Sequence, residues 1–519
     1  MTEVPPLAHP STDIAEARRT LLAEATRSTA ASRRAYRALL ALVPGDAHTL
    51  MSLGTLAAQA RDAEDLALLR RVPHLDPEGA DGYANYGSAL LSRRDPASAQ
   101  PALRRALALQ PDHVTAWYNE GLSRQQAGEI RDASTAYRRA VAASPCHIEA
   151  RRNLAVCLHS LKKIDEALHL LQDLVRETPD RADIRENIAF ILLDIGRTDD
   201  AFEELARAAE TRYGLGSAAS GSDPALSQVT PVRLKHDREQ LDHLLAQGRG
   251  DAALRQLRDT YAGLLEQVPH TAHAVQALAL SREQSRVLAP WYGRRYARRE
   301  ALAVPGSALN PALDLHDVER RYLDSRPEIT VIDGLLSDAS LLALRRFCLE
   351  NSFWIRSYGG GYLGSFMEDG FVCPLIAQIA GELRAGMSRV VGPHPLKKVW
   401  GFKYDSRLSG INLHADFAAV NVNFWIMPDS ANRDPSSGGL IIWDKPAPLS
   451  WGFEEYNRSP ELARRYLDGE GAKAITVPYR ANRAVIFNSN LFHETDRIDF
   501  KDGYENRRVN ITLLYGSRS

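Results

Sequence analysis

Two histidines and one aspartate could form a metal site in the C-terminal part of the chain. His414 and Asp416 occur as His-Ala-Asp within the segment INLHADFA, whose alternation of apolar and polar residues is typical of a strand. Residues two apart in a strand point to one face, so an imidazole and a carboxylate can reach the same point. A second imidazole, that of His493, follows the apolar stretch RAVIFNS. Two histidines and one carboxylate are the ligand set of non-haem iron(II) oxygenases, which leaves coordination positions open.

The His-x-Asp pattern alone is weak, because so short a motif recurs by chance. A second copy, His74-Leu75-Asp76, falls at a turn between two repeats and is interpreted as a surface sequence without metal. The copy at His414 differs in its context, since it has strand alternation, a downstream histidine and a downstream basic strand.

That basic strand is the segment Asn506–Thr512, which contains two adjacent arginines. Alternation places Arg508, Asn510 and Thr512 on one face and Arg507 on the other. An arginine that faces a protein interior is costly unless it is paired, and a carboxylate ligand can pair it bidentately. Two alternatives stay open: Arg508 in a surface ion pair on an edge strand, or Arg507 as the anion-binding residue.

The elements that must position these side chains are mostly short strands. From residue 329 the chain alternates like β-structure, and an amphipathic helix is expected over residues 337–351. Further strands are expected at 397–405, 411–418, 420–427, 438–444, 474–479, 483–489 and 507–516. Many short strands at this spacing predict a sandwich or a barrel.

The first two hundred residues form a repeat array instead. Prolines recur at nearly constant steps, at Pro44, Pro77, Pro111, Pro145 and Pro179. Small residues recur in the first helix of each unit, at Gly54, Gly87, Gly121, Ala155 and Ala189. Small residues let two helices approach closely and proline ends the second helix, so each unit predicts a helical hairpin.

This array resembles the tetratricopeptide repeat. The residues that carry the resemblance are Trp117, Gly121, Ala133, Tyr137, Ala140 and Pro145. The resemblance implies a right-handed all-α solenoid of about five units over residues 45–212, and a helix over about 13–42 is expected to pack on the first unit. It also implies a concave face that binds a protein or peptide. We therefore expect three parts: the solenoid at 1–212, a linker and helical capping region at 213–328, and a β-rich domain at 329–519. In the second part, helices are expected near 236–248, 251–267 and 273–290.

Residues 329–519 resemble the 2-oxoglutarate- and Fe(II)-dependent dioxygenases, which fold as a jelly roll, or double-stranded β-helix. The resemblance implies that His414, Asp416 and His493 bind the iron and that Arg508 binds the distal carboxylate of 2-oxoglutarate, with O2 as co-reactant. The run from Arg508 through Asn510 and Thr512 is similar to the Arg-x-Asn-x-Thr strand of AlkB-type members. Tyr404 matches a tyrosine that often contacts 2-oxoglutarate. Phe402 stands where AlkB-type members carry asparagine, so the subfamily is open.

Composition limits the other classes of function. Among 519 residues, 64 Lys and Arg balance 65 Asp and Glu for a net charge of -1, which argues against nucleic acid as the main partner. The four cysteines show no close spacing, so neither a disulfide scaffold nor an all-cysteine zinc site is expected. No apolar run approaches the length of a membrane span and no signal peptide is evident, so a cytoplasmic protein is expected.

Two further features allow more than one interpretation. Gly359, Gly361 and Gly364 have G-x-G-x-x-G spacing, but no βαβ unit follows, so a loop near the active-site mouth or a plain surface turn is expected rather than a nucleotide site. Asn421 and Asn423 share a face of their strand and either line the pocket or face solvent.

The leading functional hypothesis is a dioxygenase that hydroxylates a protein or peptide recruited by the solenoid. The alternatives are oxidation of a small biosynthetic intermediate with the repeats used for assembly, a non-catalytic interaction protein, and nucleic-acid demethylation. The neutral charge opposes the last of these, and the substrate side of the leading hypothesis rests on analogy of fold.

Overall fold

The computed structural model describes residues 29–59, 65–214, 226–268, 276–406 and 410–518. These residues divide into two compact units, Met1–Pro179 and Asp180–Ser519. Residues 13–28 of the expected first helix lie outside the described residues, and its remainder forms α2 (Thr29–Leu42).

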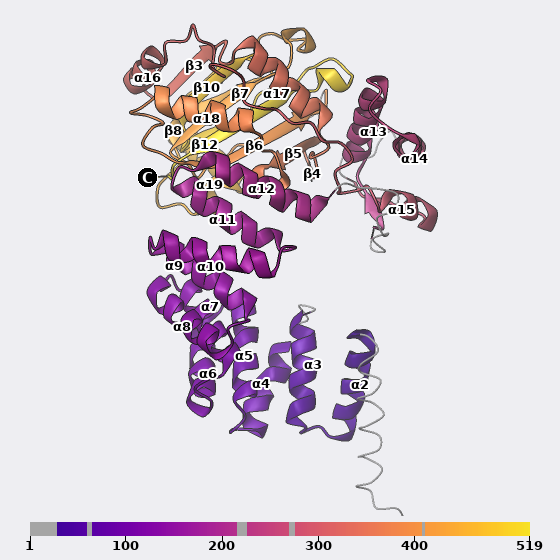
Figure 1. The fold of residues 1–519 in the computed structure, drawn as a ribbon, viewed down its shortest axis with the longest axis vertical. Helices are drawn as coiled ribbons and strands as arrows, with labels where there is room; N and C mark the ends of the chain where they lie inside the picture. The colour runs from indigo at the N-terminus through magenta and orange to yellow at the C-terminus, as the bar shows by residue number, and fades with distance from the viewer. Residues whose placement is uncertain (1–28, 60–64, 215–225, 269–275, 407–409, 519) are drawn as a thin grey trace, which may run out of the picture. The chain divides into compact units, whose positions relative to one another are not determined.

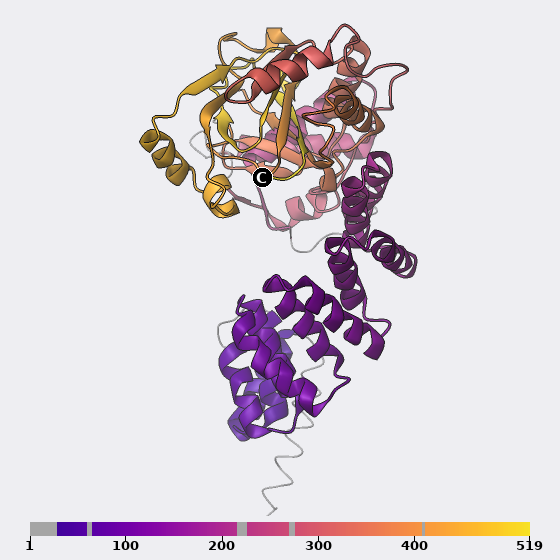
Figure 2. The ribbon, with the colours of Figure 1, turned by 90° about the vertical axis from the view of Figure 1, so that its left-hand side faces the viewer.

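The first unit is built from antiparallel helical hairpins, which lie side by side in both ribbon views (Figures 1 and 2). After α2 its helices are α3 (Ala47–Gln59), α4 (Asp65–Leu75), α5 (Ala80–Ser92), α6 (Pro96–Leu109), α7 (Val114–Gln126), α8 (Ile130–Ala143), α9 (Ile148–Ser160) and α10 (Ile164–Glu177). The recurring alanines of the second helices, such as Ala133 and Ala167, are fully buried. Each second helix ends shortly before a proline of the repeat, as the sequence pattern predicts.

Close packing inside a hairpin depends on the small residue of its first helix. A Cβ added to Gly121 on α7 would lie 2.5 Å from a ring carbon of Tyr137 on α8. The Tyr137 ring is itself fully buried, and its hydroxyl donates to Gln125 at 2.8 Å. Gly121 therefore lets the aromatic ring pack directly on the backbone of α7.

Gly121→Ala is expected to destabilise the first unit, because the added methyl group overlaps a buried ring. The expected loss is about 1–3 kcal/mol in free energy of unfolding. Gly263→Ala is the matched control, since Gly263 is also helical and has no atom within 4 Å of an added Cβ. That change should stabilise the chain by about 0.5–1 kcal/mol. Urea unfolding followed by circular dichroism compares the two, and equal effects would contradict this account of the packing.

The second unit begins with one more hairpin, α11 (Ala182–Asp194) and α12 (Thr198–Tyr213). Lys397 forms an ion pair with Asp194 of α11, and the Tyr213 hydroxyl donates to Asp369 at 2.8 Å. The chain therefore divides into compact units after Pro179, whereas the repeat pattern predicts a boundary after residue 212. The last hairpin continues the repeat in sequence but packs with the β-rich region.

Between this hairpin and the β-rich region lie α13 (Pro231–Ala246), α14 (Ala252–Glu266) and α15 (Arg282–Leu288). The first two match the helices expected there. The third expected helix, over 273–290, is wrong in its first part. Leu278–Ala279 forms strand β2, paired with β1 (Gln228–Val229), and Ser281 starts α15 through a capping box with Gln284. Residues 269–275 lie outside the described residues.

The β-rich region contains two antiparallel sheets. The larger has the order β3-β10-β7-β12-β6-β5-β4 and the smaller the order β11-β8-β9. The strands are β3 (Ile329–Asp333), β4 (Arg356–Tyr358), β5 (Tyr362–Phe366), β6 (Leu396–Tyr404), β7 (Val420–Trp425), β8 (Leu440–Pro446), β9 (Ala474–Val477), β10 (Arg483–Asn488), β11 (Leu491–Thr495) and β12 (Val509–Tyr515). The helices are α16 (Leu315–Asp324), α17 (Asp338–Glu350), α18 (Pro374–Gly386), α19 (Phe453–Asn457) and α20 (Pro460–Gly469).

The main core lies between the two sheets. Its buried cluster combines Trp425 and Phe487 from the larger sheet with Leu440, Ile442 and Leu491 from the smaller. Helices α17 and α18 cover the other face of the larger sheet (Figure 1). Strand β12 is central in that sheet, and all of its residues are buried. The faces of β12 and β6 that look toward the smaller sheet are therefore placed to line an interior site.

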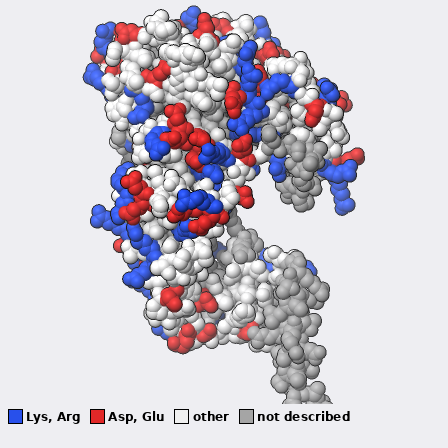
Figure 3. All heavy atoms as spheres, in the orientation of Figure 1, with Lys and Arg blue, Asp and Glu red and all other residues white. Residues whose placement is uncertain are grey.

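In the part of the chain that the structure describes, no helix has the length and hydropathy to cross a membrane. On the face shown in Figure 3, acidic and basic side chains are intermixed.

Candidate metal centre

The two histidines are brought together by backbone pairing. The His414 amide donates to the His493 carbonyl at 3.0 Å, and the His493 amide donates to the His414 carbonyl at 2.8 Å. His493 lies on β11. The expected strand over 411–418 is wrong, because His414 forms only this isolated bridge. The Ala415 and Asp416 amides instead donate to the carbonyls of Tyr456 and Ser489, so no ladder can continue.

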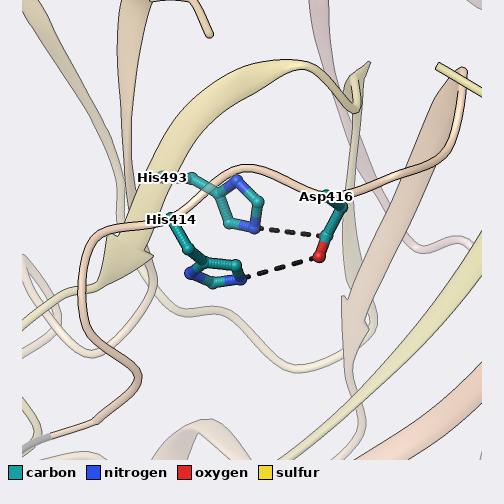
Figure 4. Close-up of side chains that lie close together, drawn as sticks. All are labelled: His414, Asp416 and His493. Atoms are coloured by element: carbon teal, nitrogen blue, oxygen red, sulfur yellow. Dashed lines mark ion pairs between the residues drawn. The ribbon is translucent and has the colours of Figure 1, made fainter. Parts of the chain in front are cut away.

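His414, Asp416 and His493 nevertheless converge on one point (Figure 4). The His414 Nε2 lies 3.7 Å from Asp416 Oδ1, and the His493 Nε2 lies 3.5 Å from Asp416 Oδ2. One potential ligand atom from each of the three residues lies within 4.8 Å of the others. All three side chains are largely buried. Two imidazole nitrogens and a carboxylate at this spacing suit a transition metal ion.

The other ring nitrogens fix the orientation of both imidazoles. His414 Nδ1 lies 2.8 Å from the Asn412 carbonyl and His493 Nδ1 lies 3.0 Å from the Leu491 carbonyl. A carbonyl only accepts, so each Nδ1 carries the proton and each Nε2 presents a lone pair to the centre. This support of the ligand imidazoles is common at metal sites.

The electrostatics favour the protonation states that a metal requires. Burial lowers the pKa of His414 to about 4, and the charge of His493 adds to the effect. Burial acts to raise the pKa of Asp416, but its contacts with the two imidazoles and the hydrogen bond from Asn421 hold this pKa below its ordinary value. At neutral pH, His414 is therefore neutral and Asp416 ionised. The donor set, its convergence and its charge state fit a divalent metal ion.

The Asp416 carboxylate has one further support. Asn421, on β7, donates its Nδ2 hydrogen to Asp416 Oδ2 at 2.9 Å, and both residues are buried. This contact fixes the plane of the carboxylate. The sequence left Asn421 open between pocket and solvent, and nothing in its local pattern singles it out for this role.

Asn421→Ala is expected to weaken metal binding about 10–100-fold without removing a ligand, because the carboxylate loses its orientation. Asn423→Ala is the matched control. Asn423 lies on the same face of β7 but donates to Thr512 Oγ1 at 2.9 Å. Titration of each metal-free variant with Fe(II) under nitrogen measures the two metal affinities. An affinity that falls equally in the two variants would point to general loosening of the pocket.

His414, Asp416 and His493, the candidate metal-binding residues, line a cavity of about 550 Å³. One wall is aromatic and comes from β4, β5 and β6, with Tyr358, Tyr362, Phe366, Trp400 and Phe402. The hairpin that joins β4 and β5 contains the glycine-rich segment, so its aromatic residues reach the cavity. The sequence did not predict this wall as a unit, although alternation along β6 was visible.

Arg508 also lines this cavity. Its side chain is 1% exposed, donating from Nε to the Gly438 carbonyl at 2.6 Å and from Nη1 to Asn510 Oδ1 at 3.2 Å. The guanidinium also lies 4.7 Å from the centre of the Tyr404 ring. Among the described residues it has no ion pair, and burial lowers its pKa from the ordinary value. A buried cation without a carboxylate partner is costly, so this position suits an anionic ligand.

Arg507 points to the other side of the sheet. Its Nε donates to Glu239 of α13 at 2.8 Å, and it contributes nothing to the cavity wall. Of the two adjacent arginines, the structure places only Arg508 beside the metal-binding residues. Both arginines precede β12, and the extended backbone that leads into this strand turns adjacent side chains to opposite sides.

The remaining predicted residues lie in the same cavity. Tyr404, Asn510 and Thr512 line it, together with Asn421 and Asn423. Burial raises the pKa of Tyr404, and the charge of Arg508 opposes that shift. In the described structure the Tyr404 hydroxyl makes no well-formed hydrogen bond, although Arg508 and Thr495 are near it. A polar ligand between Arg508 and the metal-binding residues could use this hydroxyl.

Comparison with known proteins identifies the helical part. Models of the tetratricopeptide repeat match residues 124–186 in one case and residues 86–124 and 161–219 in another. The chain contains tetratricopeptide repeats. The two models match nothing beyond residue 219, so the β-rich region stands outside them. No curated protein matches the chain.

Similar solved structures superpose on this chain with low TM-scores. A crystal structure of MamA is 23% identical and covers 33% of this chain and 96% of its own, with a TM-score of 0.27. MamA from Desulfovibrio magneticus RS-1 is 19% identical over 32% of this chain and 95% of its own, with a TM-score of 0.29. YrrB, a TPR protein with an unusual peptide-binding site, is 21% identical over 34% of this chain and 92% of its own, also with a TM-score of 0.29.

Proposed function

We propose that the protein is a 2-oxoglutarate- and Fe(II)-dependent dioxygenase that hydroxylates a protein or peptide recruited by its repeats. The observation that carries the proposal is the convergence of His414, Asp416 and His493 at a cavity that is also lined by the buried Arg508, which has no ion pair among the described residues. Two antiparallel sheets that enclose this cavity support a jelly-roll, or double-stranded β-helix, assignment for the β-rich region.

The residues of the site indicate which roles the protein would have and which its co-reactants would have. Fe(II) with 2-oxoglutarate and O2 supplies the oxidative decarboxylation that yields succinate and CO2 and the hydroxylation of a C–H bond. His414, Asp416 and His493 would hold the metal and leave coordination positions open. Arg508 would pair with the distal carboxylate of the cosubstrate, and Tyr404 could hydrogen-bond to it. The aromatic wall would exclude water and hold an uncharged part of the substrate.

The peptide substrate is supported by the repeats, because tetratricopeptide repeats generally bind proteins or peptides. The last repeat hairpin packs within the same compact unit as the cavity, through Lys397 with Asp194 and Tyr213 with Asp369. A small molecule could also occupy a cavity of this size, with the repeats used for assembly.

Removal of the first unit, residues 1–179, tests the role of the repeats. We expect slow succinate formation from 2-oxoglutarate without substrate to persist, since the metal site and α11–α12 stay in place. Turnover of a peptide identified by trapping on the full chain should fall at least about tenfold in kcat/KM. Unchanged turnover of that peptide would contradict its recruitment by the repeats of the first unit. Circular dichroism of the shortened chain shows whether it is folded.

A further inference from the structure

A second cavity, of about 370 Å³, lies apart from the metal site. Its wall is formed by α12, by the chain around residues 295–302, by the end of α17 and by the start of α18. It shares no lining residue with the metal cavity. Phe202, Phe347, Val372 and Ala377 make much of its surface apolar, and all four are buried.

One buried cation lies in this apolar wall. Arg295 is 8% exposed, and its Nη2 donates to the Asp369 carbonyl at 2.7 Å. Its Nε has no hydrogen-bond partner, and over the described ranges no carboxylate lies within ion-pair distance of its guanidinium. A Cβ at Gly370 would lie 1.4 Å from Arg295 Nη2, and Gly370 has a φ of +89°. The chain therefore uses glycine where the guanidinium must sit.

Apart from Asp199, the charged side chains that line this cavity beside Arg295 have partners among the described residues. Arg298 pairs with Glu210 at 2.6 Å, Arg299 lies 3.7 Å from Glu350, and Glu203 pairs with Arg207. Arg295 is thus the cation of this cavity that lacks an acidic partner. A buried guanidinium gains most from an anion that can accept several of its N–H groups.

We propose that this cavity binds an amphipathic anion, with its acidic head on Arg295 and its apolar body against Phe202, Phe347 and Val372. The positive charge of Arg295 requires an anionic head group on the ligand. The apolar wall disfavours small hydrophilic anions. The Asp369 residue whose carbonyl binds Arg295 also binds Arg356 through its side chain at 2.6 Å. Because Arg356 lines the metal cavity, one arginine from each cavity binds to Asp369.

Binding of three ten-carbon probes to the full chain tests the proposal. Decanoate, decanol and decylammonium have the same apolar body and differ in charge. We expect decanoate to bind with one-to-one stoichiometry in calorimetry below its micelle concentration, and at least about tenfold more tightly than the other two. Equal affinities for all three probes, or no binding of decanoate, would overturn the proposal.

Variants locate the site. Arg295→Gln should weaken decanoate binding about tenfold or more, and Ala377→Phe should block it by filling the cavity while leaving Arg295 in place. Arg298→Gln, at the rim, is the matched control and should leave the affinity within about twofold. Arg508→Gln separates this cavity from the other buried arginine. Decanoate binding that survives Arg295→Gln but is lost in Arg508→Gln would assign the probe to the metal cavity and contradict the proposal.

Discussion

Asp416→Ala is expected to abolish the conversion of 2-oxoglutarate to succinate and to weaken Fe(II) binding by more than about a hundredfold. Asp416 is the carboxylate of the three-residue set, and its two oxygens face the Nε2 atoms of His414 and His493 at 3.7 and 3.5 Å. Loss of a residue that only supports a ligand costs about 10–100-fold in metal affinity, and loss of the ligand itself should cost more. Succinate release and iron content after anaerobic loading measure the two effects.

The chain provides its own control for this experiment. His74 and Asp76 repeat the His-x-Asp pattern on the exposed surface of the first unit. Asp76→Ala should leave both iron content and succinate formation unchanged. If Asp76→Ala and Asp416→Ala behave alike, or if Asp416→Ala keeps its iron, the assignment of the metal ligands is wrong.

Arg508→Gln is expected to weaken 2-oxoglutarate binding by about 2–5 kcal/mol, because a buried charge of the ligand would lose its partner. That loss corresponds to a rise of roughly thirtyfold to several thousandfold in the dissociation constant. Arg508→Lys should restore little of the 2-oxoglutarate affinity, because the lysine ammonium cannot replace the planar guanidinium that is held between the Gly438 carbonyl and Asn510. Calorimetric titration of the Fe(II)-loaded protein with 2-oxoglutarate under nitrogen gives these constants.

Arg507→Lys is the matched control for that change. Arg507 pairs with Glu239 on the other side of the sheet, and a lysine there keeps the charge. We expect normal 2-oxoglutarate affinity in Arg507→Lys and normal Fe(II) affinity in Arg508→Gln, whose metal ligands are untouched. Loss of Fe(II) binding in Arg508→Gln would show that the arginine acts through the fold. Equal loss of 2-oxoglutarate affinity in the two lysine variants would contradict the role given to Arg508.

The local patterns in the sequence predict the helical repeats and most strands. The spacing of Pro111, Pro145 and Pro179 with the small residue Gly121 is sufficient for the hairpins, because helix termination and close packing act within one repeat. The extended backbone that leads into β12 likewise separates Arg508 from Arg507, because adjacent side chains of an extended chain point to opposite sides. Strand alternation predicts the convergence of His414 with Asp416, but the strand expected around them does not form. The hydrogen bonds of the Ala415 and Asp416 amides to the carbonyls of Tyr456 and Ser489 hold this segment instead.

The features of the fold that could not be predicted from the sequence depend on contacts between segments that are distant in the chain. The pairing of Leu278–Ala279 with Gln228–Val229 replaces part of an expected helix. The ion pair of Lys397 with Asp194 draws the last hairpin into the second unit. The hydrogen bonds of the Ala415 and Asp416 amides to the carbonyls of Tyr456 and Ser489 replace the strand expected around His414. None of these has a signature in its own local pattern, because each depends on where the rest of the fold places the partner.

The central claim is that His414, Asp416 and His493 hold Fe(II) in a site that also binds 2-oxoglutarate. Its most direct test is anaerobic addition of Fe(II) and 2-oxoglutarate to the full chain, followed by visible absorption. The resemblance to 2-oxoglutarate-dependent dioxygenases predicts a weak metal-to-ligand charge-transfer band in the green region that is absent in Asp416→Ala and unchanged in Asp76→Ala. If the folded wild-type protein gives no band, or if Asp416→Ala gives the same band, the account of the metal centre is contradicted.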